Sequence, residues 1–144
     1  MKGIILMHVD KNQEEIHGPD LKELIEINMG LHNKIYNLPH WEDRISIFEP
    51  YRNQITTISY RTPENSIGIQ WYDCKLQIIN DNINYVEICG QRLSLCIRTM
   101  KDLLEGKHST HNPLFEKLEW SKELYHEVLK SVIPTEILYD LSMQ

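Results

Sequence analysis

The sequence lacks alanine altogether, has only three cysteines and contains no long apolar run. No run approaches the roughly 18 apolar residues of a membrane-spanning helix, so we expect no contact with a membrane. Three cysteines without a C-x-x-C pair do not make a disulfide-rich or redox-active scaffold. We therefore expect reduced thiols and a cytoplasmic protein. The absence of alanine beside 19 isoleucines and 10 asparagines is typical of an AT-rich coding sequence, as found in some bacteria and phages.

Catalytic and cofactor motifs are also missing. The chain has no glycine-rich phosphate loop and no G-x-S-x-G nucleophile elbow. His108 and His111 form the tightest histidine pair, but they lie in a predicted loop and lack the helix and the intervening Glu of a metalloprotease motif. We therefore predict no metal site and no cofactor, and we favour a protein that is not an enzyme.

The 144 residues, of which 41 % are hydrophobic and 25 % charged, are typical of one globular domain spanning residues 1–144. A chain of this length can bury a sizeable core without the help of metals or disulfides.

Residues 67–99 carry the strongest structural pattern, in which apolar and polar residues alternate. Gly90-Gln91 has glycine where a type II′ turn requires it, so the pattern predicts an antiparallel hairpin of residues 85–89 and 92–97. This register places five apolar residues on one face, where they would form the core: Val86, Ile88, Leu93, Leu95 and Ile97.

The alternation changes phase at Trp71-Tyr72, between residues 67–71 and residues 74–78. We interpret the change as a β-bulge or as the junction of two strands. A bulge would aim a Trp and a Tyr at a binding surface, whereas imperfect strand pairing is the simpler interpretation.

The remaining segments complete an α+β fold with an antiparallel sheet of five to seven strands. Further strands are predicted at residues 2–9, 44–48 and 54–60. Helices are predicted at residues 19–37, at 99–106 and in two segments that begin at 112 and 121, followed by a short turn around Ile137. We expect the helices to pack mainly on one face of the sheet.

All five arginines lie between Arg44 and Arg98, within the strand-rich middle of the chain. Guanidinium groups beside aromatic rings can bind oxyanions, which predicts an anion site for a nucleotide, for a phosphorylated metabolite or for the substrate of a small hydrolase. The candidate residues are Arg61, Arg92, Arg98, Trp71 and Tyr72. The alternative is that these arginines form cross-strand ion pairs. The net charge of −6 argues against binding to an extended nucleic acid.

Both ends of the chain are acidic, and aromatic residues stand among the C-terminal carboxylates. Such a surface can attract a basic protein, with the aromatic ring as the anchor. We predict a protein-binding module that inhibits another macromolecule, as immunity proteins and phage inhibitors do. The predicted contact residues are Glu119, Trp120, Glu123 and Glu127. Apolar residues on the second face of the sheet also favour a homodimer.

His8 and Asp10 stand at the end of the first predicted strand. Strand ends are common places for catalytic side chains, so this pair is a candidate for proton transfer. The H-x-D pattern is short and often occurs by chance, and His8 and Asp10 are therefore a secondary candidate.

Overall fold

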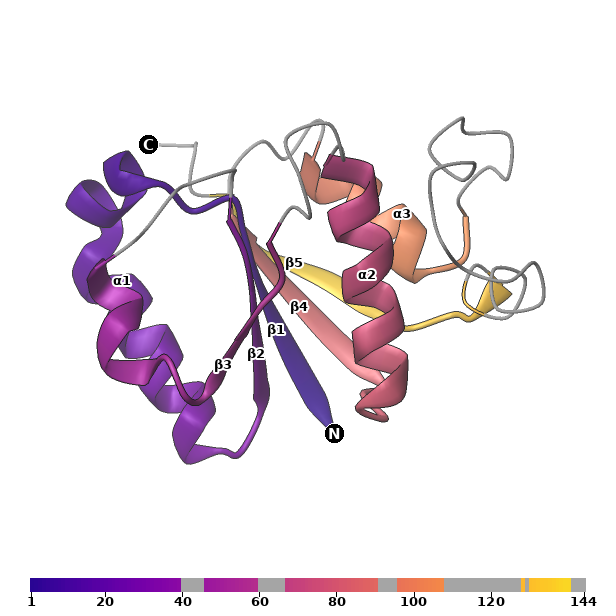
Figure 1. Ribbon diagram of the computed structural model, residues 1–144, viewed down its shortest axis with the longest axis horizontal. Helices are drawn as coiled ribbons and strands as arrows, with labels where there is room; N and C mark the ends of the chain where they lie inside the picture. The colour runs from indigo at the N-terminus through magenta and orange to yellow at the C-terminus, as the bar shows by residue number, and fades with distance from the viewer. Residues whose placement is uncertain (40–45, 60–66, 91–95, 108–127, 129, 141–144) are drawn as a thin grey trace.

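The computed structural model describes residues 1–39, 46–59, 67–90, 96–107, 128 and 130–140 (Figure 1). These residues form one five-stranded sheet in the order β3-β2-β1-β4-β5, and every pair of neighbouring strands is parallel. The strands are β1 (Lys2–Met7), β2 (Lys34–Leu38), β3 (Ile55–Thr57), β4 (Tyr85–Gly90) and β5 (Thr135–Asp140).

The parallel sheet shows that the predicted antiparallel fold is wrong. Instead of turning back at Gly90, β4 inserts between β1 and β5, so that Ile88 pairs with Ile5 on one side and with Ile137 on the other. Strands of parallel sheets are usually covered on both faces and are apolar on both. Consistent with this, Val86 to Gly90 are all buried. Residues 91–95, which include most of the second strand of the predicted hairpin, lie outside the described residues.

Helix α1 (Lys11–Gly30) follows β1 after a short turn, eight residues earlier than predicted. The side chain of Asp10 caps its first turn by accepting a hydrogen bond from Gln13 N at 3.0 Å. Pro19 lies inside the helix. The preceding residue, Gly18, has no Cβ to clash with the proline ring, which allows the helix to continue.

Helix α2 (Ile67–Asn80) occupies the segment for which strands were predicted. The change of phase at Trp71-Tyr72 is therefore neither a bulge nor a strand junction. It reflects the helical period, because the buried residues recur three or four positions apart. These residues are Gln70, Tyr72, Cys74, Lys75 and Ile78.

Helices cover both faces of the sheet, so the expectation of one covered face is also wrong (Figure 1). On the α1 side, Ile4 and Leu6 of β1 pack with Leu21 and Ile25. On the opposite side, the core contains Ile5 and Met7 together with residues of α2 and α3 (Arg98–Leu104). Alternate residues of β1 thus belong to two separate cores.

Some of the smaller predictions hold and others fail. The strands predicted at 2–9, 54–60 and 85–89 are confirmed by β1, β3 and β4, and the helix predicted at 99–106 is confirmed by α3. The strand predicted at 44–48 is wrong, because η1, a 3₁₀ helix, spans Ser46–Tyr51. The turn predicted around Ile137 is also wrong, because this residue belongs to β5. The helices predicted from residues 112 and 121 fall almost entirely outside the described residues.

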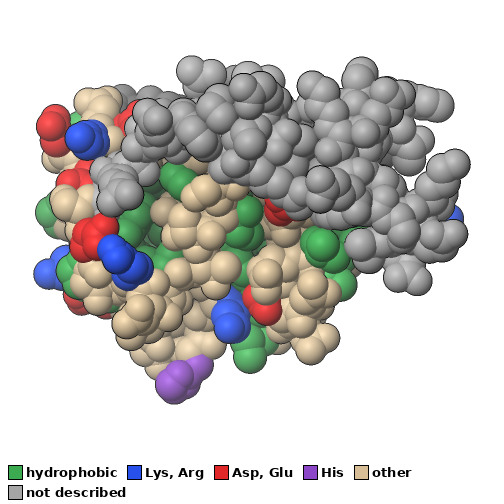
Figure 2. All heavy atoms as spheres, viewed as in Figure 1, with side chains coloured by type: hydrophobic (Ala, Val, Ile, Leu, Met, Phe, Trp, Pro, Cys, Tyr) green, Lys and Arg blue, Asp and Glu red, His purple; other side chains and the backbone are tan. Residues whose placement is uncertain are grey.

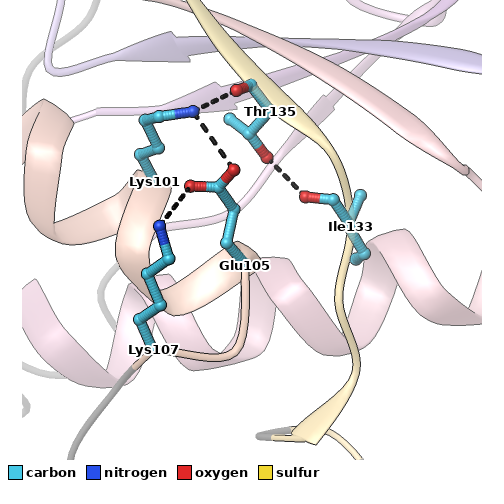
Figure 3. Close-up of polar contacts among 5 residues, drawn as sticks. All are labelled: Lys101, Glu105, Lys107, Ile133 and Thr135. Carbon is cyan, nitrogen blue, oxygen red and sulfur yellow. Dashed lines mark hydrogen bonds and ion pairs between the residues drawn. The ribbon is translucent and has the colours of Figure 1, made fainter.

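Polar contacts attach β5 to the end of α3 (Figure 3). Lys101 Nζ donates to the backbone oxygen of Thr135 and lies 3.3 Å from Glu105 Oε2. Lys107 Nζ lies 3.7 Å from the other oxygen of Glu105. The backbone N of Ile133 adds a 2.9 Å hydrogen bond to Leu104 O. These contacts hold the start of β5 against α3. Within the described part of the chain, no helix is long and apolar enough to span a membrane.

Candidate functional site

The strand order identifies the candidate site. The chain leaves β1 for β2 on one side, and it later crosses to β4 on the other side of β1. In such doubly wound sheets, ligands bind outside the carboxyl ends of the strands, at the point where the strand order reverses. That point is the edge where β1 and β4 end, at Met7 and Gly90, which are paired in the register.

His8 is the first residue beyond β1 at this edge. Its backbone N donates to Leu38 O at 2.8 Å, and its φ of 52° lies in the left-handed region. Few residues other than glycine adopt this conformation, and such strain is concentrated at functional sites. The side chain of His8 is buried.

Gln70, in the first turns of α2, holds the imidazole of His8. The distance from Gln70 Oε1 to His8 Nε2 is 3.1 Å. The amide nitrogen of Gln70 donates to the backbone oxygens of Pro39 and Ile58, both at 2.8 Å. Trp71 lies beside the imidazole, with 6.3 Å between ring centroids. Residues far apart in the sequence thus form one buried polar group around His8.

Asp10 lies two residues beyond His8 and is half-buried. Its carboxylate caps α1, so its position is set by the start of that helix. The turn from His8 to Asn12 contains no glycine. A dinucleotide-binding turn needs glycines for the close approach of the pyrophosphate, so this turn does not match that class of site.

A groove of about 370 Å³ lies beside the first turns of α1, which begin at the same edge. Its lining residues are Lys11, Glu14, Glu15, Ser46 and Glu49. The carboxylate of Glu14 accepts hydrogen bonds from Ser46 Oγ at 2.7 Å and from Ile47 N at 3.3 Å. These bonds attach η1 to α1. The volume is within the range of small-molecule sites. Across the described residues, no group of three or more His, Cys, Asp or Glu is placed to hold a metal ion.

A further feature marks the same edge. Asn37, near the end of β2, is buried, and among the described residues its Oδ1 accepts no hydrogen bond. A buried acceptor of this kind is uncommon and can be satisfied by a ligand. Cys96, which lies just before α3, is also buried, as are Cys74 and Cys89, and none of the three forms a disulfide. The prediction of reduced core thiols is therefore confirmed.

The predicted anion site falls partly outside the described residues. Arg61 and Arg92 lie outside the described residues, whereas Arg98 is exposed at the start of α3. Tyr72 is buried in the core, and Trp71 lies beside His8. Trp71 and Tyr72 are on α2 and not on a sheet. The predicted protein-binding residues Glu119, Trp120, Glu123 and Glu127 all lie outside the described residues.

Gln70 and Lys75 are the polar residues that the sequence analysis missed. Both were assigned to a strand, which hid their common helical face. Lys75 is buried, and its Nζ donates to Leu103 O at 2.5 Å and to Ser131 O at 2.9 Å. Burial lowers the pKa of its amino group to about 8. The amino group joins backbone carbonyls of two other segments, so it serves the fold.

No family model, curated protein or solved structure matches this chain.

Proposed function

We propose that this protein binds a small molecule at the carboxyl edge of its sheet, between the ends of β1 and β4. The observation that carries the proposal is His8, a buried non-glycine residue in the left-handed region at the point where the strand order reverses. Parallel sheets of this order place their ligands at that point. The buried Asn37 acceptor near the end of β2 and the groove beside the start of α1 belong to the same carboxyl edge of the sheet.

The residues that follow β1 carry groups that are capable of proton transfer. His8 and Asp10 are an imidazole and a carboxylate two residues apart, and both types of group transfer protons. This proposal moves the anticipated small-molecule site from the arginines to the end of β1.

The test is a thermal-shift screen of the purified protein against metabolites and hydrolase substrates. A ligand at 100 times its Kd stabilises the folded state by about 2.7 kcal/mol, which raises the Tm by several degrees. The variant is His8→Asn, because Asn also tolerates a positive φ but lacks the imidazole. His32→Asn is the matched control, since His32 has a φ of 59° and is exposed in the turn after α1.

The expected result is a ligand whose thermal shift is lost in His8→Asn and kept in His32→Asn. A ligand that stabilises both variants as well as the wild type binds elsewhere and would count against the proposed site. A screen in which no compound shifts the Tm would count against small-molecule binding itself.

A second proposal is binding to a basic protein through an acidic surface. Large apolar side chains are exposed on α1, with Ile16 at 49 % and Ile27 at 52 %, and the exposed carboxylates of Glu15 and Glu23 lie on the same helix. Figure 2 shows acidic and basic side chains intermixed with apolar ones on the α1 side of the molecule. Exposed apolar residues among carboxylates are suited to a partner with basic groups.

The test of this second proposal is affinity purification of the tagged protein from its native host. The association rate and affinity of a stoichiometric protein partner would then be measured for a variant with reversed charges at Glu119, Glu123 and Glu127, and for a second variant with reversed charges at Glu15 and Glu23. A slower association with one of the two variants would identify the surface that the partner binds. Unchanged affinity in both sets would reject the acidic-surface proposal.

A further inference from the structure

The side of α1 that faces away from the sheet carries exposed apolar side chains (Figure 1). Ile16 is 49 % exposed, Ile27 is 52 % exposed, and Leu31, the C-cap residue of the helix, is 64 % exposed. Leu21 and Ile25 of the same helix are buried in the core. One exposed apolar residue is ordinary on a protein surface, whereas several in a row on one helix indicate a contact surface.

Asp20 and Glu23 complete this row. With the three apolar residues they follow the spacing i, i+4, i+7, i+11 and i+15, which stays on one side of a helix. Both carboxylates are exposed. Among the described residues neither of them forms an ion pair or a side-chain hydrogen bond, whereas Glu14 and Glu26 accept hydrogen bonds from residues of η1. We call the row the outer stripe, and its residues are Ile16, Asp20, Glu23, Ile27 and Leu31.

The charges within the outer stripe disfavour a second copy of this chain as its partner. In an antiparallel pair of α1 helices that places Ile16 against Ile27, Asp20 of each copy would face Glu23 of the other. Four carboxylates would then lie between the apolar contacts, and like charges opposed in an interface weaken binding. A lipid surface is disfavoured as well, because burial of both isoleucines would also bury the carboxylates between them.

We propose that the outer stripe docks a basic amphipathic helix of another protein. Ile16 and Ile27 lie about 16.5 Å apart along the helix axis. Two helices that cross at about 20° can stay in contact over this length. The partner would place apolar side chains opposite the three apolar residues of the outer stripe, and lysine or arginine opposite Asp20 and Glu23. The apolar contacts anchor the partner, and the opposite charges select it and raise its association rate.

This inference rests on the second proposed function, binding to a basic protein. It identifies the surface on α1 and the residue pattern of the partner. The pattern is apolar at i, i+11 and i+15 and basic at i+4 and i+7, read along the partner helix in either chain direction.

The probe is a synthetic helical peptide with leucine at i, i+11 and i+15 and lysine at i+4 and i+7. The control peptide has glutamate in place of both lysines. One helix face is smaller than a standard protein interface, so we expect a weak complex, which NMR titration of the ¹⁵N-labelled protein detects. The lysine peptide should shift amide signals of α1, and the glutamate peptide should not. No shift, shifts confined to another surface, or equal shifts with both peptides would overturn the inference.

The apolar contacts are tested with Ile27→Ala, which should weaken binding of the lysine peptide at least about fivefold. The control is Val132→Ala, because Val132 is 68 % exposed but lies outside α1, before β5. Equal affinities of Ile27→Ala and Val132→Ala would overturn docking on this face. All substituted side chains are exposed, so we expect both variants to fold.

The charged contacts are tested with the double variant Asp20→Asn/Glu23→Gln. Its affinity for the lysine peptide should fall about fivefold at low salt. The difference from the wild type should disappear at about 1 M salt, where charges are screened. The control is Glu15→Gln/Glu26→Gln, which removes two exposed carboxylates of α1 outside the outer stripe. An equal loss of affinity in this control would overturn the inference, because the net charge of α1 and not the pattern of the stripe would then recruit the peptide.

A protein partner from the native host distinguishes this inference from the function on which it rests. We expect Ile27→Ala and Asp20→Asn/Glu23→Gln to weaken its binding. A partner that binds both variants as tightly as the wild type would overturn docking on the outer stripe, but it would leave the basic-partner proposal to other acidic surfaces. Self-association of the wild type that Ile27→Ala abolishes, measured by sedimentation velocity, would assign the stripe to a second copy and overturn the inference. A peptide that does not bind, together with a host that yields no partner, would reject both.

Discussion

The hydroxyl of Tyr36 on β2 donates a 2.7 Å hydrogen bond to Asp81 Oδ2, in the turn that follows α2. Gln77 Nε2 donates to the other carboxylate oxygen at 2.9 Å. The Tyr36–Asp81 hydrogen bond joins β2 to the end of α2, the helix that connects β3 with β4. It helps to hold α2 on its face of the sheet.

Tyr36→Phe should lower the free energy of unfolding by about 1.5–3 kcal/mol, because a buried hydrogen bond to a charged group is lost. Burial and the neighbouring Asp81 raise the pKa of Tyr36. A tyrosine with a raised folded-state pKa stabilises the fold fully below about pH 10, and this contribution is lost as the pH rises further. Urea unfolding of both proteins from pH 7 to pH 11 measures the difference.

The control is Tyr51→Phe, because the hydroxyl of Tyr51 donates to Glu26 in an exposed pair. Water can replace an exposed hydrogen bond, so we expect little change in stability. Equal losses in the two variants would contradict a special role for the Tyr36–Asp81 bond.

Gly90→Ala should destabilise the protein by about 1–3 kcal/mol or more, as overpacking does. A Cβ at residue 90 would overlap the carbonyl oxygen of Met7 and lie 2.7 Å from Met7 Cβ. The ends of β1 and β4 would have to separate, which should also weaken ligand binding at this edge. Thermal unfolding measures the first effect.

Gly30→Ala at the end of α1 is the matched control, because its Cβ would meet no atom within 4 Å. Alanine favours a helix over glycine, so this variant should be neutral or slightly more stable. If Gly90→Ala were as stable as Gly30→Ala, the ends of β1 and β4 would be less tightly packed than the structure indicates.

Cys74 and Cys89 should not react with a thiol reagent in the native protein at pH 8. Burial raises the pKa of Cys74, and it raises the pKa of Cys89 to about 12. The reactive form is the thiolate, which both residues then lack at pH 8. In Cys96→Ser, titration with Ellman's reagent should detect no thiol before denaturation and two afterwards. Rapid reaction of the native variant would contradict the burial of both side chains.

The difference in the free energy of unfolding between the wild type and Lys75→Met should depend on pH, because the pKa of Lys75 is lowered in the folded protein. The folded-state pKa is about 8 against 10.5 for the ordinary value, so between these pH values the unfolded chain binds more protons than the folded protein. The wild type should therefore gain stability relative to Lys75→Met as the pH rises from 8 to 10, by up to about 1.4 kcal/mol per pH unit. Urea unfolding at each pH measures this difference, and the cysteines cancel because both proteins contain them.

The same substitution at an exposed lysine of α1, Lys22→Met, provides the comparison. The free energy of unfolding of Lys22→Met should differ little from that of the wild type, because the side chain is exposed. A constant difference between wild type and Lys75→Met would mean that the buried amino group keeps its ordinary proton affinity.

Local pattern was sufficient to predict several elements of this protein. The apolar run that contains β1, the β-branched residues of β3 and the alternating residues of β4 were all read correctly as strands. The helix of residues 98–104 was also predicted, and Gly106 beyond its end has a φ of 76°. These features depend on backbone preferences and on residues that are close in the sequence.

The partners of the strands were decided by the tertiary structure. Val86 and Ile88 suit a hairpin with residues 92–97 as well as a parallel position beside β1, because each arrangement buries the side chains of these two residues. Residues 67–80 were misread because isoleucine and aromatic residues favour strands in isolation, whereas burial against the sheet here favours a helix.

The candidate site follows the same division. The sequence by itself placed His8 and Asp10 at the end of the first strand, and this position is correct. It could not identify Gln70, because the contact with His8 spans 62 residues and depends on the crossing of α2 over the sheet. Strand ends are encoded locally, whereas the strand order that brings Gly90 beside Met7 and Gln70 beside His8 results from the burial of two separate cores.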